Sequence, residues 1–174
     1  IRITLDHPEI FLVQIRAMLK ANAGLDNLRL LLPMISTLAE ADEAIALIHR
    51  AYNELLEEGE KVTLPQIGAM VEVPSVIYQI EPLARRVDFL SVGSNDLTQY
   101  LLAVDRNNAR VAELYDSLHP AVVHALKFVV EGAKKHRVPV SVCGEMAGDP
   151  LAALLLLGLG INALSMSCLL YTSD

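Results

Sequence analysis

Short apolar segments alternate with amphipathic segments along this chain, and this alternation limits the possible folds more than any other feature. The apolar segments are near-continuous, as in strands buried on both faces of a parallel sheet. They cover residues 28–35, 66–73, 87–93, 138–143 and 161–166. Helical spacing of apolar residues marks residues 8–21, 38–58, 75–85, 120–136 and 150–157. The alternation predicts parallel strands joined by right-handed crossovers, and therefore an α/β fold.

Two architectures have this pattern, the doubly wound sheet and the (β/α)₈ or TIM barrel. Polar residues follow three predicted strands directly: Glu72, residues 94–96 (SND) and residues 143–145 (CGE). At the carboxyl ends of parallel strands they meet on one face, where barrel enzymes have their active sites. No G-x-G-x-x-G opens a helix after the first strand. We therefore predict a barrel with only the later strands and helices present, because a complete one has eight strands and about 250 residues.

Composition excludes several classes of function. Hydrophobic residues make up 53% of the 174 residues and charged residues 20%, which excludes a disordered chain. A net charge of −7 argues against nucleic acid and anionic membranes as partners, so a cytoplasmic domain is expected. Residues 151–173 are uncharged and match a transmembrane helix in length. Glycines, serines and Asn162 interrupt them, so we predict a buried helix, a glycine stop and a strand instead.

Two carboxylates are candidates for a metal site. Glu72 closes one predicted strand and Asp96 follows the next one along the chain. Carboxylates at neighbouring strand ends can hold Mg²⁺, which prefers oxygen ligands and keeps waters for a phosphorylated substrate. A structural salt bridge is the alternative for Glu72, because an unpaired buried carboxylate is costly.

Two further residues are candidates for binding an anion. Asn95 opens a short predicted helix at residues 97–103, and free N–H groups at a helix start bind carboxylate or phosphate. The alternative is that Asn95 or Asp96 only caps that helix. Arg106 lies in a polar loop and could grip an anionic group through two nitrogens, although solvated loop arginines are common.

Cys143 ends a predicted buried strand and precedes Gly144, where the backbone can pass close to a ligand. The alternative is that the thiol is a small buried hydrophobe. No other cysteine or histidine lies within zinc-ligand spacing of Cys143, and the five histidines are scattered. Zinc is therefore not expected.

Three blocks of sequence resemble a known family. Residues 66–75 (QIGAMVEVPS), 87–107 (VDFLSVGSNDLTQYLLAVDRN) and 142–150 (VCGEMAGDP) are similar to signature blocks of enzyme I of the bacterial phosphoenolpyruvate-dependent phosphotransferase system. The resemblance runs in order from about residue 1 to residue 167, and residues 107–120 resemble the nitrogen-related branch. Pyruvate phosphate dikinase and phosphoenolpyruvate synthase share the barrel and parts of these blocks, and are the nearest alternatives.

The resemblance implies a phosphoenolpyruvate-binding TIM barrel. In that family the matching Glu72 and Asp96 would ligate Mg²⁺, and Asn95, Asp96 and Arg106 would hold the substrate's carboxylate and phosphate. Cys143 would protonate the enolate carbon to give pyruvate. The family also implies a homodimer and a histidine phosphocarrier protein as partner, with no membrane insertion.

The chain also departs from the family pattern. The family's acceptor histidine belongs to a separate domain and its phosphate-gripping arginines to earlier barrel strands, so this chain alone is expected to be inactive in phosphoryl transfer. Residues 168–174 leave the pattern, and we interpret them as an atypical, foreign tail after a barrel segment at residues 1–167. Two alternatives to catalysis are a dimerisation module and an incomplete barrel that aggregates through exposed strand edges.

Overall fold

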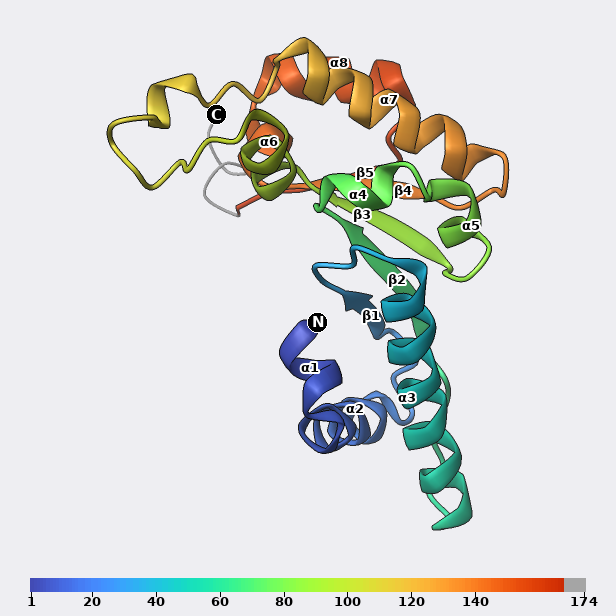
Figure 1. The fold of residues 1–174 in the computed structure, drawn as a ribbon. Helices are drawn as coiled ribbons and strands as arrows, with labels where there is room; N and C mark the ends of the chain where they lie inside the picture. The colour runs from blue at the N-terminus through green and yellow to red at the C-terminus, as the bar shows by residue number, and fades with distance from the viewer. Residues whose placement is uncertain (168–174) are drawn as a thin grey trace.

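A computed structural model describes residues 1–167 as one parallel sheet with helices packed along it (Figure 1). The sheet has the order β1-β2-β3-β4-β5, so every strand pairs with its neighbour in the sequence. The strands are β1 (Arg29–Leu32), β2 (Gln66–Val71), β3 (Phe89–Gly93), β4 (Val140–Cys143) and β5 (Ala163–Ser165). All five lie inside the predicted apolar segments, and all four pairings are parallel. The predicted α/β class is confirmed.

The helices fill the connections between strands. In chain order they are α1 (Arg2–Asp6), α2 (Pro8–Asn22), α3 (Leu38–Glu57), α4 (Pro74–Ile77), α5 (Ile80–Ala84), α6 (Ser94–Leu102), α7 (Pro120–Lys134) and α8 (Pro150–Leu159), with the 3₁₀ turns η1 (Ala112–Leu114) and η2 (Glu145–Gly148). Helices α2 and α3 pack together at the β1 end of the sheet, and α7 and α8 lie along the β4 and β5 end (Figure 1).

The longest helix, α3, begins at a capping box. The Thr37 side chain accepts a hydrogen bond from the Glu40 N–H, and the Glu40 carboxylate accepts one from the Thr37 N–H. This exchange satisfies backbone donors that no helical carbonyl can reach. One face of α3 is fully buried, with Ala41, Ala44, Ile48, Ala51 and Leu55. The predicted amphipathic pattern at residues 38–58 is therefore confirmed.

The helix predicted at residues 75–85 is wrong in one respect, since the structure has two short helices there. Helix α4 ends before Tyr78, and Gln79 has φ −118° and ψ 16°, outside the helical region. Pro82 lies four residues after Tyr78. A proline ring clashes with the carbonyl four residues earlier and lacks an N–H, so the helix breaks between them.

The two faces of the sheet differ in chemistry. Every second side chain along each strand points to the face that the helices cover. Most of those side chains are buried, among them Ile67, Val71, Leu90 and Val142. The opposite face carries mostly small or polar residues, including Gly68, Ser91, Ser141, Cys143, Ala163 and Ser165. Within residues 1–167, β1 and β5 each pair along one edge only, so the sheet does not close. This is the partial barrel that the sequence predicts.

The uncharged segment forms a helix, a stop and a strand as far as the structure describes it, but the prediction that the helix is buried is wrong. Only Ala152 and Leu156 of α8 are buried, and Leu151, Leu154 and Leu157 are exposed, because α8 packs against α7 and η2 along one face only. Helix α8 ends where Gly160 adopts a left-handed conformation with φ 94°, and β5 follows. Among the described residues, no helix is both long and apolar enough to cross a bilayer. The last part of the segment and the proposed tail, residues 168–174, lie outside the described residues.

Candidate functional site

Three consecutive strands bring the predicted polar residues to one edge of the sheet. Glu72 follows β2, Asn95 and Asp96 stand in the first turn of α6 after β3, and Cys143 ends β4. Helix α6 begins at Ser94, directly after β3 and three residues before the predicted start. No side chain caps it, so the alternative reading of Asn95 or Asp96 as a helix cap is wrong. The predicted convergence at the carboxyl edge is confirmed.

Glu72 is buried, with 4% of its surface exposed. Its Oε1 accepts a hydrogen bond of 2.7 Å from the N–H of Met34 in the loop after β1. A Cβ on Gly93 would lie 2.7 Å from Glu72 Oε2, so only glycine leaves room for the carboxylate at this point of β3. The carboxylate is thus held between two neighbouring strands.

The electrostatics of Glu72 suit a bound cation. Burial raises the pKa of the Glu72 carboxyl above its ordinary value, the bond from Met34 lowers it, and the charge of Asp96 raises it again. Two adjacent carboxylates of like charge require either a proton or a cation between them. Their oxygens are the ligands that Mg²⁺ prefers, and two carboxylates with waters and a substrate oxygen complete its usual shell. Within residues 1–167, no cluster of three or more His, Cys, Asp or Glu stands ready to bind a metal.

Asn95 connects the first turn of α6 with the segment after β4. Its Oδ1 accepts a hydrogen bond of 3.1 Å from the N–H of Glu145 and one of 3.4 Å from the hydroxyl of Tyr115. The hydroxyl of Ser94 donates to the carbonyl of Cys143 at 2.7 Å. Gly144 has φ +106°, and a Cβ there would lie 2.5 Å from Ser94 Oγ. The first turn of α6 and the segment after β4 are therefore in close contact beside the acidic pair.

Arg106 lies in the long connection after α6 and lines a pocket of about 280 Å³ with Asn107, Ala112, Tyr115 and Glu145. Its Nη1 is 3.5 Å from Glu145 Oε1, and its backbone N–H donates to the side chain of Gln99 at 3.2 Å. Arg106 therefore lies beside Glu145, the first residue of η2, whose backbone N–H also contacts Asn95. The contacts of Arg106 with Glu145 and of Tyr115 with Asn95 were not predicted from the sequence, because they depend on how the 103–119 loop folds back.

Cys143 is half-buried on the face of the sheet that the helices do not cover. Its thiol donates a weak hydrogen bond to the Val92 carbonyl at 3.4 Å and accepts one from Ser91 Oγ at 3.9 Å. Burial raises the pKa of the thiol, the contact with Ser91 lowers it, and the charges of Glu72 and Asp96 raise it further. The sulfur therefore keeps its proton at neutral pH.

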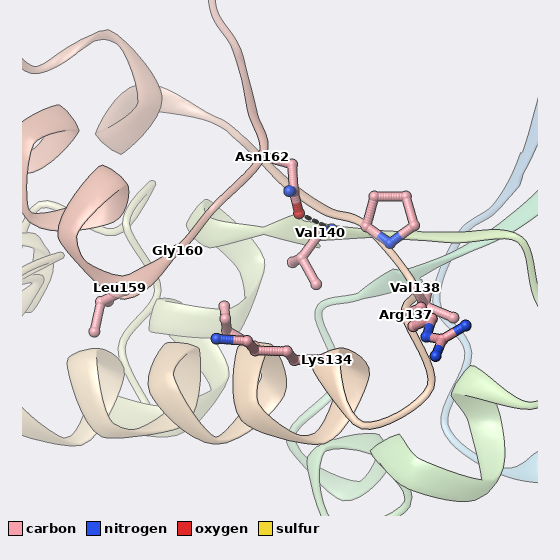
Figure 2. A pocket seen from close by; sticks show the side chains of 9 residues that line it. Lys134, Arg137, Val138, Val140, Leu159, Gly160 and Asn162 are labelled. Atoms are coloured by element: carbon pink, nitrogen blue, oxygen red, sulfur yellow. Dashed lines mark hydrogen bonds between the residues drawn. The ribbon is translucent and has the colours of Figure 1, made fainter.

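A second pocket lies at the other end of β4 (Figure 2). It has a volume of about 270 Å³ and is lined by residues at the ends of α7 and α8, including Lys134, Leu159 and Gly160. Asn162 Oδ1 accepts a hydrogen bond from the Val140 N–H there at 2.8 Å. None of the candidate catalytic, substrate-binding or metal-binding residues lines this pocket, because it faces the amino ends of the strands.

Fold comparisons agree with the barrel interpretation. An HpcH/HpaI aldolase/citrate lyase family protein from Burkholderia cenocepacia superposes with a TM-score of 0.62 and 20% identity, over 90% of this chain and 65% of that one. A citrate lyase from Burkholderia xenovorans gives 0.63 and 20%, over 92% of this chain and 51% of that one. The fold and the edge site together define part of a (β/α)₈ barrel with its functional groups at the carboxyl ends of the strands.

Sequence comparisons identify the family. The family model described as "PEP-utilising enzyme, PEP-binding domain" matches residues 1–170, and the chain belongs to this family of phosphoenolpyruvate-binding domains. A relative from Escherichia coli named "Phosphoenolpyruvate-dependent phosphotransferase system" is 57% identical over 96% of this chain and 22% of that protein. A "Phosphoenolpyruvate-protein phosphotransferase" from Cupriavidus necator is 46% identical over 95% of this chain and 28% of that protein. The chain therefore spans less than a third of the length of these relatives.

Proposed function

We propose that this chain is the phosphoenolpyruvate-binding part of a phosphoenolpyruvate-protein phosphotransferase. The observation that carries the proposal is the acidic pair Glu72 and Asp96 beside the anion-binding groups of Asn95 and Arg106. A substrate with a phosphate and a carboxylate needs both kinds of group in one place. The names of the relatives and the family description support this choice of substrate and reaction.

Each residue of the site has a proposed task. Glu72 and Asp96 hold Mg²⁺, which when bound supplies positive charge beside the substrate's oxygens. Asn95 and Arg106 orient the two anionic groups, because an amide N–H and a guanidinium both donate to oxyanions. Phosphoryl transfer depends mainly on such positioning and charge neutralisation, and little on covalent help from the protein.

Cys143 completes the reaction as a proton donor. When the bond between phosphorus and the enol oxygen breaks, the phosphoryl group passes to the acceptor histidine and the electron pair stays on the enolate. Carbon 3 of the enolate takes the thiol proton, which gives pyruvate and a thiolate that is reprotonated from water. The raised pKa of the thiol suits this task, since a proton donor must be protonated at the working pH.

The partners, assembly and location of the longer protein are also proposed from the family of its relatives. The acceptor histidine and the phosphocarrier protein belong to the longer protein and its partner, and the working form is a cytoplasmic homodimer. Assignment to the nitrogen-related branch stays a prediction from residues 107–120.

The experiment is a thermal melt of the chain with Mg²⁺ alone, phosphoenolpyruvate alone, and both. A ligand that binds only the folded state raises stability by about 2.7 kcal/mol at one hundred times its dissociation constant. We expect the midpoint to rise only with both ligands, and the rise to disappear in Glu72→Gln. Glu57→Gln, an exposed carboxylate on α3, is the matched control and should keep the full rise. An equal rise in Glu72→Gln would exclude the metal assignment, and no rise in the unaltered chain would contradict the proposed substrate.

A further inference from the structure

Tyr115 makes a contact that the proposed reaction does not explain. It follows η1 in the connection between α6 and α7, and its side chain is half-buried. The phenol hydroxyl donates to Asn95 Oδ1 at 3.4 Å, across the space between this connection and the first turn of α6. A tyrosine in a surface loop needs no such partner, because water can satisfy its hydroxyl.

The contact fixes which way the Asn95 amide faces. An amide oxygen has two lone pairs, and here the Glu145 N–H uses one at 3.1 Å while Tyr115 uses the other. The Glu145 N–H can only donate, so the oxygen must face it and the NH₂ group must face away, and the Tyr115 hydroxyl holds the same oxygen from a second side. The Asn95 Nδ2 makes no hydrogen bond to the described residues and is left as a free donor beside the acidic edge.

The surroundings of Tyr115 place it at the substrate edge. It lines the same pocket as Arg106 and Glu145. Burial raises the pKa of the phenol, the Thr98 hydroxyl beside it and the Arg106 charge lower it, and the charges of Glu145 and Asp96 raise it. The hydroxyl therefore stays protonated, and so remains a donor, throughout the neutral range. Among the described residues, Asn95 Oδ1 is the acceptor that the phenol hydroxyl contacts.

We propose that Tyr115 is a positioning residue of the phosphoenolpyruvate site, which holds the Asn95 amide oxygen so that Asn95 Nδ2 donates to an anionic oxygen of the substrate. This inference rests on the proposed function. The alternative is that Tyr115 only packs the 103–119 connection against α6, in which case its ring matters and its hydroxyl does not.

The test removes the hydroxyl and keeps the ring. In the full chain with Mg²⁺, Tyr115→Phe should weaken phosphoenolpyruvate binding about three- to tenfold, the usual effect of one lost neutral hydrogen bond. The ligand-free melting midpoint should change little. Tyr100→Phe, an exposed tyrosine on α6 with no hydrogen bond among the described residues, is the matched control and should bind as the unaltered chain does. Unchanged affinity in Tyr115→Phe would overturn the proposal.

A double-mutant cycle shows whether Tyr115 acts through Asn95. If it does, Tyr115→Phe should have no effect on binding in an Asn95→Ala background, whereas additive losses would overturn the proposal. If the unaltered chain fails to bind phosphoenolpyruvate, the proposed function fails, and the side-chain amide resonance of Asn95 in a ¹⁵N spectrum decides on Tyr115. A shift of that resonance in Tyr115→Phe, absent in Tyr100→Phe, supports positioning, and an unmoved resonance overturns it.

Discussion

Arg106 and Glu145 form an ion pair across two loops, with 3.5 Å between Nη1 and Oε1. The Glu145 side chain is 80% exposed, whereas that of Arg106 is 34% exposed. An exposed pair of this kind is weak, on the order of 0–1 kcal/mol, and is screened by salt. The arginine is therefore easily released to an anionic ligand that approaches its pocket.

Glu145→Gln should consequently strengthen phosphoenolpyruvate binding, because it removes a carboxylate that competes with the substrate for Arg106. We expect an increase of about two- to fivefold at low ionic strength, within the range for an exposed pair, and a smaller one at 0.5 M salt. Titration calorimetry at two salt concentrations measures both effects. Weaker binding in Glu145→Gln would show that the carboxylate assists the substrate site instead.

Glu72→Gln should stabilise the ligand-free chain while abolishing binding that depends on Mg²⁺. The amide oxygen can still accept the Met34 N–H, but the buried charge beside Asp96 is gone. A single-site gain of about 1 kcal/mol would raise the melting midpoint by about 2–4 °C in a chain of this length. A lower melting midpoint in Glu72→Gln would mean instead that the ionised carboxylate stabilises the fold.

The stability gained from Glu72→Gln should depend on pH in a defined direction. The folded carboxyl has a pKa above its ordinary value of 4.5, so between these two values the folded chain holds a proton that the unfolded chain releases. Stability from this group is full below pH 4.5 and is lost as the pH rises through the folded pKa. The difference in midpoint between Glu72→Gln and the unaltered chain should thus be small at pH 4 and larger at pH 7. An equal difference at both pH values would contradict the raised pKa.

Cys143→Ala should slow pyruvate formation in a protein extended to the full length of the relatives, and leave substrate affinity largely intact. Loss of a proton donor lowers the rate by about 10²- to 10⁴-fold, and kcat falls while KM stays nearly constant. Ser141→Ala changes the same face of β4 two residues earlier and should have little effect on the rate. A normal rate in Cys143→Ala would remove the thiol from the mechanism.

Two glycines should respond to alanine with opposite signs. At Gly144 the positive φ and the 2.5 Å approach to Ser94 Oγ leave no room, so we expect a loss of about 1–3 kcal/mol. Gly158 lies in α8 with no atom within 4 Å of the new methyl group, so alanine should stabilise the chain by about 0.5–1 kcal/mol. Urea unfolding measures both. Equal effects at the two positions would contradict the close loop contact.

The sequence predicted the strands and the placement of the site because both depend on local patterns. Each apolar segment contains a strand, and the ends of β2, β3 and β4 carry the polar residues that the sequence places there. Glu72, Asp96 and Cys143 follow from this rule alone, since parallel strands bring their carboxyl ends together.

Contacts made by irregular segments could not be predicted in this way. The bond from Met34 to Glu72 depends on a loop residue with φ +54°, and the pairing of Arg106 with Glu145 depends on the path of the 103–119 connection. No periodicity in the sequence encodes such a path. The division of one predicted helix into α4 and α5 follows from Pro82, because a proline disrupts the helical turn before it.

The order of the strands has a consequence for synthesis on the ribosome. Because each strand pairs with the one before it, β3 finds β2 already made, and Glu72 and Asp96 can meet as soon as α6 has emerged. β4 arrives several seconds later, at about 5–20 residues per second, and only then adds Cys143 to the edge. A nascent chain stalled between α6 and β4 would thus display the acidic pair without its proton donor.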